Sequence, residues 1–326
     1  MRREEKMILA IGNSGIYEVN AFKAVVAELK KRGHEAISFK QDKCLDGEYL
    51  VFEVINNKPI YSIVIDGKTY NVDDFSAIWY MKPHLPFKLI NFEPVEYRQF
   101  IHRQFRAMRT ALWSIFRHKK WIDDPWTIQI AENKLYQLNL ATQIGFTIPD
   151  TLVTSDPDRV KGFYEKHNGN IIVKLLNATP MVNQVLYTNR VTAEYLAQID
   201  SVKMSPSMFQ ACISKEYELR ITVVGDEIFP VKIYSQEDEA TSLDWRKKPK
   251  LNDFDLKMEQ TTLPEKVEQR IRNYMKAIGL HYGCIDMIVG KDSKYIFLEI
   301  NPNGQWYFVQ LRAEAKIAKA IANLLT

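Results

Sequence analysis

The sequence contains few cysteines, and their placement excludes two kinds of protein. Its 326 residues include only three, Cys44, Cys212 and Cys284, which are scattered and odd in number. Such a pattern is typical of reduced thiols in the cytosol and not of a disulfide framework. The six histidines do not combine with them at the spacing of a zinc site, so we exclude bound zinc.

Long apolar runs and glycine-rich nucleotide loops are also missing. The first apolar run, MILAI, is too short to span a membrane and lacks the longer apolar region and cleavage site of a signal peptide. The glycines of GNSG, residues 12–15, match neither the G-x-G-x-x-G pattern nor a P-loop, so we interpret them as a structural turn. We therefore expect a cytoplasmic protein without a membrane partner.

The composition favours a folded chain with a small excess of positive charge. The 44 basic residues exceed the 40 acidic residues by a formal charge of +4. That excess suits a polyphosphate or an acidic peptide as ligand but is too small to indicate nucleic acid. Hydrophobic residues make up 46% of the chain and charged residues 26%, which is typical of a globular protein. The length predicts two or three packed units.

Alternating strand and helix patterns predict an α/β (α+β) fold. Residues 7–39 read as strand, glycine turn, helix and strand, and three β-rich runs follow between residues 48 and 81. Residues 95–120 form a predicted helix whose arginines crowd its polar surface: Arg98, Arg103, Arg106, Arg109 and Arg117. We interpret this surface as solvated. A peptide-docking or subunit-contact face is the main alternative, and a nucleic-acid face is the least favoured.

The segment WIDDPW, residues 121–126, is a predicted break between domains. Asp124 is a suitable helix N-cap, and Pro125 suits the first helical turn. A single helix is expected over residues 127–145, with Lys134 in its interior, and the chain becomes β-rich after Gln210. We predict domains at residues 1–122, 123–208 and 209–326.

The stretch YIFLEINPNGQW, residues 295–306, predicts a metal site. Successive strand side chains alternate faces, so Glu299 and Asn301 project to the same side. If residues 291–294 form a four-residue hairpin turn, Asp286 of the preceding strand lies opposite Glu299. Two adjacent carboxylates repel each other, and oxygen ligands of this kind suit Mg²⁺. A single carboxylate would instead be read as a surface acid at a strand end.

Basic side chains that could hold a nucleotide lie upstream of this stretch. Lys174 ends the apolar strand IIVK, where its desolvation requires a compensating anion. Lys134 alone would be read as an ordinary solvated helix lysine. In the strand after FQACI, Glu218 and Arg220 are two residues apart and therefore lie on the same face. By the same alternation we expect Lys232 to lie on the face of Arg220.

Together these segments resemble a known family. In their order, ENKLYQL, IIVKLL, FQACI, ELRITVVGDEIFPVKI, DWR, CIDMIV and FLEINPNGQW resemble the ATP-grasp carboxylate–amine/hydroxyl ligases. Within that family the chain is most similar to the maturases of graspetides, the microviridin-type ω-ester and ω-amide peptide synthetases. The similarity runs from about residue 121 to the end, and residues 7–84 resemble the N-terminal domain more weakly. It implies a three-lobed ATP-grasp fold with an N-terminal pre-ATP-grasp α/β domain.

The resemblance also implies a nucleotide site. Lys134 and Lys174 would hold the α- and β-phosphates of ATP. The adenine and the ribose would be bound by a set of neighbouring residues: Gln210 and Cys212 beside the adenine, Ala211 and Ile213 through their backbone, and Glu218 on the ribose hydroxyls, with Glu216 as the less favoured substitute. Many relatives carry a glycine-rich flap after the second lysine, whereas NATPMVNQ, residues 177–184, has no glycine and contains Pro180.

The remaining implied roles concern the reaction. Arg220, Lys232 and Arg246 would face the γ-phosphate and the carboxylate being activated. Asp286, Glu299 and Asn301 would bind one or two Mg²⁺ ions.

The activity implied is ATP-dependent peptide macrocyclisation by a homodimeric enzyme. Asp or Glu carboxylates of a ribosomal precursor peptide, with a leader and a Thr/Asp/Glu-rich core, would condense with Thr or Ser hydroxyls or a Lys amine. We expect ω-esters in preference to ω-amides. The alternatives are an ATP-grasp amino-acid or protein-terminus ligase of the glutamate-ligase type, a non-catalytic ATP-binding regulatory module, and a nucleic-acid-binding protein that uses the arginine helix.

Overall fold

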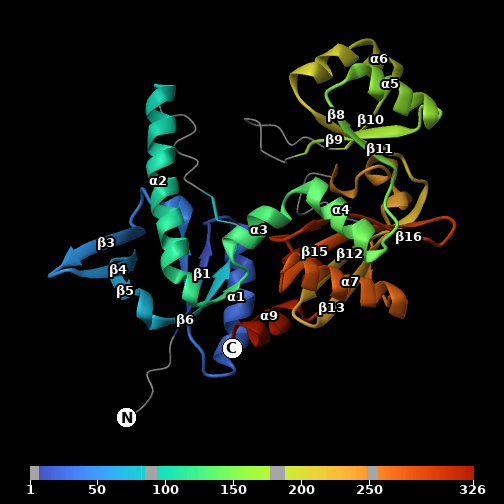
Figure 1. Cartoon of the computed structure of the whole chain (residues 1–326). Helices are drawn as coiled ribbons and strands as arrows, with labels where there is room; N and C mark the ends of the chain where they lie inside the picture. The colour runs from blue at the N-terminus through green and yellow to red at the C-terminus, as the bar shows by residue number, and fades with distance from the viewer. Residues whose placement is uncertain (1–6, 82, 85–93, 177–187, 248–255) are drawn as a thin grey trace.

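The chain folds into an N-terminal domain and two further lobes. A computed structural model describes residues 7–81, 83–84, 94–176, 188–247 and 256–326. Figure 1 shows the N-terminal domain at one end of the molecule, a small middle lobe at the other end, and the C-terminal sheet below the middle lobe and beside the N-terminal domain. No helix in the described part of the chain is long and apolar enough to cross a membrane.

A parallel sheet of four strands, in the order β2-β1-β6-β7, forms the centre of the N-terminal domain. Its elements are β1 (Met7–Gly12), α1 (Ile16–Lys30), β2 (Ala36–Lys40), β6 (Phe75–Tyr80) and β7 (Lys120–Ile122). The predicted strand, turn, helix and strand are therefore confirmed. Leu9 and Ala10 of β1 are both buried, because a central parallel strand packs on both faces.

Two elements extend from this sheet. One is a separate antiparallel sheet, β3-β4-β5, built from β3 (Tyr49–Ile55), β4 (Lys58–Ile65) and β5 (Lys68–Asn71). The other is α2 (Val95–Ile115), which ends in a short 3-10 helix, Phe116–His118. Leu112 and Trp113 anchor the end of α2 in the core, whereas its N-terminal half stands clear of the other described elements in Figure 1.

The middle lobe is small and has its own core. Its antiparallel sheet has the order β10-β9-β11-β8. The elements are β8 (Thr151–Thr154), α5 (Pro157–Lys166), β9 (Ile171–Lys174), β10 (Asn189–Arg190), α6 (Ala193–Ala197), the 3-10 helix Ile199–Met204 and β11 (Ser207–Ala211). Val160 of α5 packs against Ile171 and Phe209 in this core.

The C-terminal lobe is an antiparallel sheet of five strands in the order β14-β13-β12-β15-β16. Its strands are β12 (Lys215–Val224), β13 (Glu227–Ile233), β14 (Met258–Gln260), β15 (Tyr282–Gly290) and β16 (Tyr295–Asn301), and its later helices are α7 (Glu265–Ile278), α8 (Tyr307–Ala313) and α9 (Ile317–Leu325). The ring of Tyr274 in α7 packs at a tilt against that of Phe297 in β16, with centroids 5.0 Å apart, so α7 covers one sheet face and leaves the other for polar side chains.

The single helix expected over residues 127–145 is wrong: two helices occupy the segment. They are α3 (Pro125–Ala131), with Asp124 as N-cap, and α4 (Lys134–Ile144), which ends at the left-handed Gly145. Asn133 interrupts the helix because its side chain accepts a hydrogen bond from the Tyr136 N–H and caps α4. Lys134 is therefore the first residue of a helix and not an interior one.

One apolar core joins the N-terminal domain to the C-terminal lobe. Ala21 and Val25 of α1 belong to the same buried cluster as Ile317 and Ile321 of α9. The described part of the chain thus has one large shared body and a middle lobe packed on it. The division at residues 122/123 and 208/209 stays a prediction.

Candidate active site

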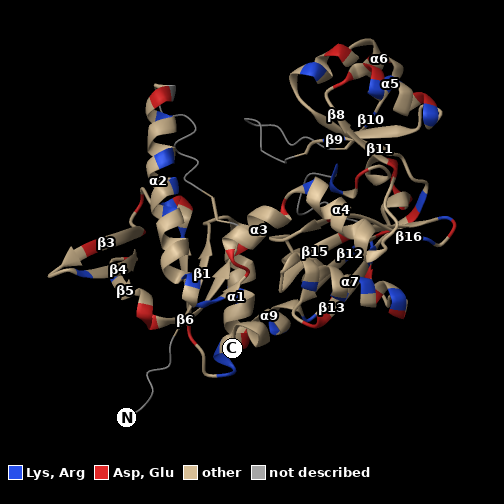
Figure 2. Cartoon of the chain, in the orientation of Figure 1, with Lys and Arg blue, Asp and Glu red and all other residues tan. Residues whose placement is uncertain are grey.

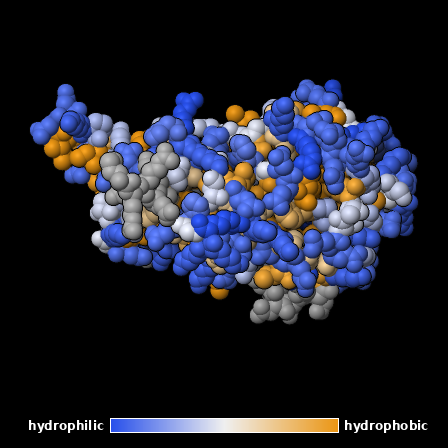
Figure 3. All heavy atoms as spheres, turned by 90° about the horizontal axis from the view of Figure 1, so that it is seen from below, coloured by the Kyte–Doolittle hydropathy of each residue, from blue (hydrophilic) through white to orange (hydrophobic). Residues whose placement is uncertain are grey.

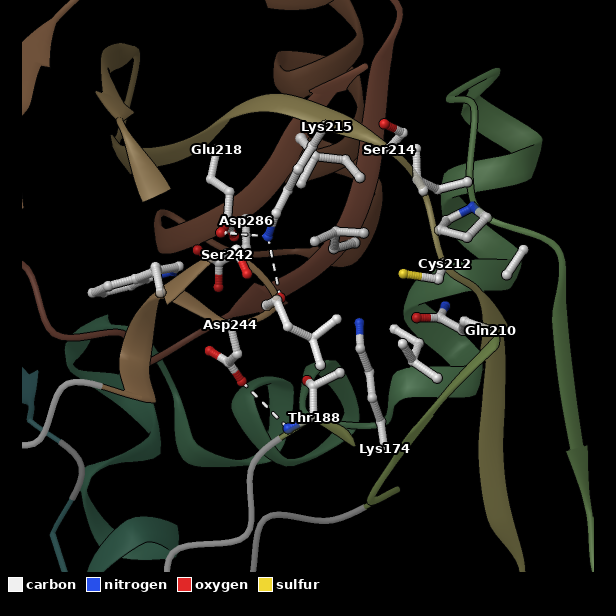
Figure 4. A pocket seen from close by; sticks show the side chains of 18 of the residues that line it. Lys174, Thr188, Gln210, Cys212, Ser214, Lys215, Glu218, Ser242, Asp244 and Asp286 are labelled. Atoms are coloured by element: carbon white, nitrogen blue, oxygen red, sulfur yellow. Dashed lines mark hydrogen bonds and ion pairs between the residues drawn. The ribbon is translucent and has the colours of Figure 1, made fainter. Parts of the chain in front are cut away.

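A cavity of about 390 Å³ lies between the middle lobe and the five-stranded sheet. Figure 4 shows Lys174 and Gln210 of the middle lobe pointing into the space that Glu218, Asp286 and Asp244 face from the other side. The cavity lining includes most of the residues singled out from the sequence: Lys174, Gln210, Ala211, Cys212, Ile213, Glu218, Arg246, Asp286 and Glu299. Lys134, Arg220 and Asn301 lie directly behind this lining, in contact with Glu299 or Asp286.

Asp286 lies opposite Glu299, as the sequence predicted. Residues 291–294 separate the two strands, as expected. The pairing next to this turn nevertheless joins Val289 to Tyr295, which is one residue out of the expected register. That register alone would turn Glu299 away from Asp286. A β-bulge between Asp286 and Met287 shifts the pairing by one residue and returns Glu299 to the face of Asp286.

Arg220 is the side chain that holds Asp286 in place. It lies directly across from Asp286 on β12, and its Nη1 is 3.0 Å from each carboxylate oxygen. Its Nη2 donates to the Gln305 carbonyl at 3.0 Å, and Nδ2 of Asn301 donates to Asp286 Oδ2 at 2.9 Å. Burial raises the pKa of Asp286, and the guanidinium offsets part of that rise.

Gly304 permits the loop after β16 to close over Arg220. A Cβ at this position would lie 2.5 Å from Cys284 Cβ and 2.7 Å from Arg220 Nη2. No other amino acid fits without displacing a buried strand or the guanidinium. The Pro-Asn-Gly turn thus has a steric role that the sequence alone did not reveal.

The two lysines flank Glu299. Lys134 Nζ is 3.0 Å from Glu299 Oε2, while Lys174 Nζ forms no ion pair with any described residue. Burial lowers the pKa of Lys174, and Glu299 offsets part of this effect. Burial would raise the pKa of Glu299, but the two lysines and Arg246 hold it below its usual value. Lys134, Lys174 and Arg246 thus surround the single carboxylate of Glu299, and their excess positive charge can accept a further anion.

The strand that leaves the middle lobe offers backbone groups to the cavity. The N–H of Cys212 donates to the Asn170 carbonyl at 2.9 Å, and the Cys212 carbonyl accepts from Asn170 Nδ2 at 3.0 Å. Asn170 therefore clamps this residue, whereas the Ile213 N–H has no hydrogen-bond partner among the described residues. Gln210 is buried and donates to Thr151 Oγ1, but its Oε1 is unpaired within the described chain.

Glu218 faces the cavity, whereas Glu216 is exposed. Lys215 Nζ contacts Glu218 Oε1 at 2.7 Å and the Leu243 carbonyl at 3.1 Å. A register shift between Lys215 and Tyr217 brings Lys215 onto the face of Glu218. Burial raises the pKa of Glu218, and the contact with Lys215 offsets part of the rise.

Arg246 enters the cavity from the short 3-10 helix Trp245–Lys247. Its Nε and Nη2 both lie 2.8 Å from the carboxylate oxygens of Asp244. Asp244 is buried, and it also accepts a long bond of 3.4 Å from the Thr188 N–H. Burial alone would raise the pKa of Asp244, but the hydrogen bonds from Arg246 bring it well below its usual value.

The prediction that Lys232 shares a face with Arg220 is wrong. The two-residue turn Gly225–Asp226 pairs Val224 with Glu227, and the resulting register sets Lys232 opposite Leu219. Directly paired residues share a face, and Arg220 is on the other one. Lys232 Nζ instead lies 4.1 Å from the centre of the Tyr217 ring.

Three contributors to the site were not singled out from the sequence. They are Asn170, Lys215 and Asp244. Asp244 could have been found, because it directly precedes the Trp245–Arg246 pair of the DWR motif. Lys215 could not, because strict alternation places it on the wrong face until the bulge is known. The loop at residues 177–184, whose lack of glycine was noted above, lies outside the described residues.

The cavity is thus built to receive an anion. Its basic groups come from both lobes, and each acidic group is held by a basic neighbour. Within the described residues there is no group of three His, Cys, Asp or Glu side chains that could hold a metal. Oxygen ligands for a cation would be Asp286 and Glu299, with the carbonyl oxygen of Asn301.

Comparisons with known proteins cover nearly all of the described chain. Residues 7–129 match the family described as the MvdD pre-ATP grasp domain, and residues 131–325 match the RimK-like ATP-grasp domain. A solved RiPP-associated ATP-grasp ligase of Chryseobacterium gregarium, in complex with ADP and a leader and core peptide, is 29% identical. Its TM-score is 0.86, and the match covers 98% of this chain and 96% of that one.

Two further relatives differ in how much they cover. The macrocyclase MdnC of Microcystis aeruginosa, bound with precursor peptide MdnA, is 29% identical with a TM-score of 0.85 over 98% of this chain and 99% of that chain. The alpha-aminoadipate–LysW ligase LysX of Sulfurisphaera tokodaii is 26% identical over 187 residues. That match spans 56% of this chain and 63% of the relative's length.

Proposed function

Because the chain belongs to the RimK-like ATP-grasp family, we propose that it is an ATP-dependent peptide macrocyclase. The ATP-grasp ligase fold with a pre-ATP-grasp domain, expected from the motifs, is confirmed by the two family matches and the solved structures. The observation that carries the proposal is the extent of likeness to the two peptide-bound enzymes. It spans 98% of the chain, including the N-terminal domain, and not the nucleotide lobes alone.

ATP-grasp folds bind ATP or ADP, and the groups in the cavity fit that ligand. The buried Gln210 Oε1 and the Ile213 N–H, both without a partner among the described residues, can meet a donor and an acceptor on an adenine edge. Cys212 contributes packing only, because its backbone is held by Asn170. In this proposal Glu218 binds the ribose hydroxyls, and Lys134 and Lys174 bind the α- and β-phosphates. Glu218 and Lys174 line the cavity and Lys134 contacts Glu299 beside it, which supports these roles.

Magnesium also fits the residues present. Asp286, Glu299 and Asn301 are hard oxygen donors on one sheet face, and the carboxylates keep free lone pairs beside Arg220 and Lys134. When bound, Mg²⁺ would neutralise phosphate charge. Whether one or two ions bind stays part of the proposal.

The proposed reaction has two steps. A peptide side-chain carboxylate takes the γ-phosphoryl group of ATP, which yields an acyl phosphate and ADP. A Ser or Thr hydroxyl, or a Lys amine, then attacks the acyl carbon, loses its proton and displaces inorganic phosphate. Such chemistry needs positioning and charge neutralisation more than a covalent nucleophile.

The arginines address the main barrier of the first step. Two unit negative charges at ~4 Å repel by about 4 kcal/mol at an effective dielectric of ~20. Arg246 lines the cavity and can meet these anions directly. Arg220 is buried behind Asp286, with an Nε that has no partner among the described residues, so it acts chiefly by holding Asp286 in place. The catalytic role first expected of Lys232 has no geometric support.

Several finer features remain part of this proposal. They are the ester type of the crosslink, the Thr/Asp/Glu-rich core, the cytoplasmic location and the homodimer. Peptide-bound relatives support a precursor peptide as partner.

Mass spectrometry of a candidate precursor peptide with a leader and a Thr/Asp/Glu-rich core tests the proposal. Incubation with enzyme, ATP and Mg²⁺ should remove one water per crosslink and release one ADP. The Arg220→Lys variant keeps the charge but cannot contact Asp286 and the Gln305 carbonyl through two nitrogens, so it should bind ADP and form at least ~10²-fold less product. A peptide that stays unmodified while ATP is bound would contradict the assignment.

The ligase LysX gives one specific alternative. Its name describes joining alpha-aminoadipate to LysW, and its match covers 187 residues of this chain. An enzyme of that type would raise the mass of its acceptor by one amino acid less one water, whereas each crosslink lowers the mass of the peptide by one water. The same spectra therefore distinguish the two functions.

A further inference from the structure

The first helix of the N-terminal domain contacts the segment that follows the loop after β16. Tyr17 lies in the first turn of α1, and its hydroxyl oxygen accepts a hydrogen bond from the Phe308 N–H at 2.8 Å. Its ring meets the ring of Tyr307 edge-on, with centroids 6.1 Å apart. Tyr307 and Phe308 are the first residues of α8. The contact therefore joins the N-terminal domain to a point 291 residues further along the chain.

The start of α8 needs a hydrogen-bond acceptor from outside the helix. The first four N–H groups of a helix have no partner within it, and the N-cap side chain often accepts one of them. The N-cap of α8 is Trp306, whose indole has only a donor and which makes no cap hydrogen bond. The hydroxyl of Tyr17 supplies the missing acceptor from another domain.

The N-terminal domain also backs the loop itself. A small cavity of about 40 Å³ is lined from one side by Tyr17 and Trp79 and from the other by Tyr282, Gly304 and Gln305. The Tyr282 hydroxyl donates to the Gly304 carbonyl. Seen from below in Figure 3, the N-terminal domain and the rest of the molecule form one continuous body. The loop between β16 and α8 is thus held from two sides.

This loop fixes the position of Arg220. The Gln305 carbonyl accepts from Arg220 Nη2 at 3.0 Å, and Arg220 Nη1 contacts Asp286. Asp286 is the only charged residue of β15, and the strand is mostly tan in Figure 2. Burial raises the pKa of Tyr17, and the Phe308 N–H and the charge of Arg220 offset part of that rise. A line of contacts therefore runs from α1 through the loop to Arg220 and Asp286.

We propose that Tyr17 is a positioning residue for the ligase reaction: it holds the start of α8, and with it the loop whose Gln305 carbonyl keeps Arg220 on Asp286. This inference rests on the proposed function, which gives Arg220 and Asp286 their roles. The N-terminal domain is then a working part of the active site. Among the described residues that line the cavity of about 390 Å³, Tyr17 does not occur, so its loss should change rate and not nucleotide affinity.

The Tyr17→Phe variant tests the role in the reaction. It keeps the ring against Tyr307 and removes only the acceptor for the Phe308 N–H. The kcat for peptide crosslinking should fall roughly tenfold, with ADP affinity within about threefold of wild type. The control is Tyr195→Phe in α6, whose hydroxyl makes no hydrogen bond with another described residue and which should turn over like wild type. A kcat for Tyr17→Phe equal to that of the control would overturn the proposal.

A double variant tests whether Tyr17 acts through Arg220. If both residues serve one line of contacts, adding Tyr17→Phe to Arg220→Lys should lower kcat by less than about twofold more. A further tenfold loss would mean that the two substitutions act independently. Tyr17 would then support the fold in general, and the positioning role would be rejected.

Hydrogen exchange reads the loop without any reaction. The Gly304 N–H donates to the Asn301 carbonyl at 3.0 Å, and in Tyr17→Phe this amide should exchange several-fold faster, together with that of Phe308. Unchanged exchange at Gly304 would show that Tyr17 does not hold the loop. A wild-type enzyme that forms no crosslinks would instead contradict the proposed function, and the exchange experiment would still decide the role of Tyr17.

Discussion

Substitution of Gly304 by Ala tests how closely the reaction depends on the position of Arg220. The added Cβ would lie 2.5 Å from Cys284 Cβ and 2.7 Å from Arg220 Nη2. Such distances are far inside ordinary contact, so the loop or the guanidinium must move. Overpacking of this kind costs about 1–3 kcal/mol of stability. The backbone at Gly304 does not have a positive φ, so the effect is steric and not conformational.

A shift of the guanidinium away from Asp286 should lower product formation far more than nucleotide affinity. A misplacement of about 1 Å can cost ~10²-fold in rate, and Gly304 does not line the nucleotide cavity. We expect a 10- to 100-fold loss in peptide crosslinking, with ADP affinity within about threefold of wild type by calorimetry.

The matched control for this experiment is Gly162→Ala in α5. A Cβ at Gly162 meets nothing within 4 Å, and the helix should gain about 0.5–1 kcal/mol of stability with no change in rate. The steric reasoning would be refuted if Gly304→Ala turned over like Gly162→Ala while remaining folded.

Three further predictions follow from individual contacts. Lys174→Met should weaken ADP binding roughly 10- to 100-fold, because Lys174 Nζ faces the cavity without an ion-pair partner in the described chain. The control is Lys232→Met, on the opposite sheet face, which should bind ADP like wild type in the same titration. Asn170→Ala removes the hydrogen bond to the Cys212 carbonyl and should cost about 1 kcal/mol of stability by urea unfolding, with a several-fold weaker ADP affinity. The hydrogen bond to Asp123 raises the pKa of His281 in the folded protein. Protonated His281 therefore stabilises the fold fully below the pKa of ~6.5 that it has in the unfolded chain, and this stabilisation is lost as the pH rises through the higher pKa of the folded state. Because the His281 side chain is exposed, the effect should stay below about 1 kcal/mol, and a His281→Gln variant with the same pH dependence as wild type would reject it.

The central prediction from the sequence, that Asp286 lies opposite Glu299, was correct, but only part of its structural cause could be read from the sequence. Alternation and the short turn suggested the pairing. The register at the turn is in fact displaced by one residue, and the bulge before Met287 restores it. Bulges lack a reliable sequence signal, so two irregularities that cancel produced the expected outcome.

The errors have equally local causes. The sheet face on which Lys232 lies was predicted wrongly, although the two-residue turn Gly225–Asp226 was sufficient to fix the register of the two strands. The break before Lys134 was missed because Asn133 is tolerated in helices and reveals its capping role only when its side chain meets the Tyr136 N–H. Family, fold and most cavity residues were accessible from motifs. The clamp by Asn170 and the clearance at Gly304 depend on contacts between distant segments, which a single sequence does not contain.

The buried cluster shared by α1 and α9 sets a limit on engineering by domain exchange. Ala21 and Val25 lie in one buried cluster with Ile317 and Ile321, so α1 and α9 form one fitted surface. A chimera that takes its N-terminal domain from a relative should need that relative's α9 as well. Grafts that respect only the boundary in the sequence would leave mismatched apolar faces and aggregate.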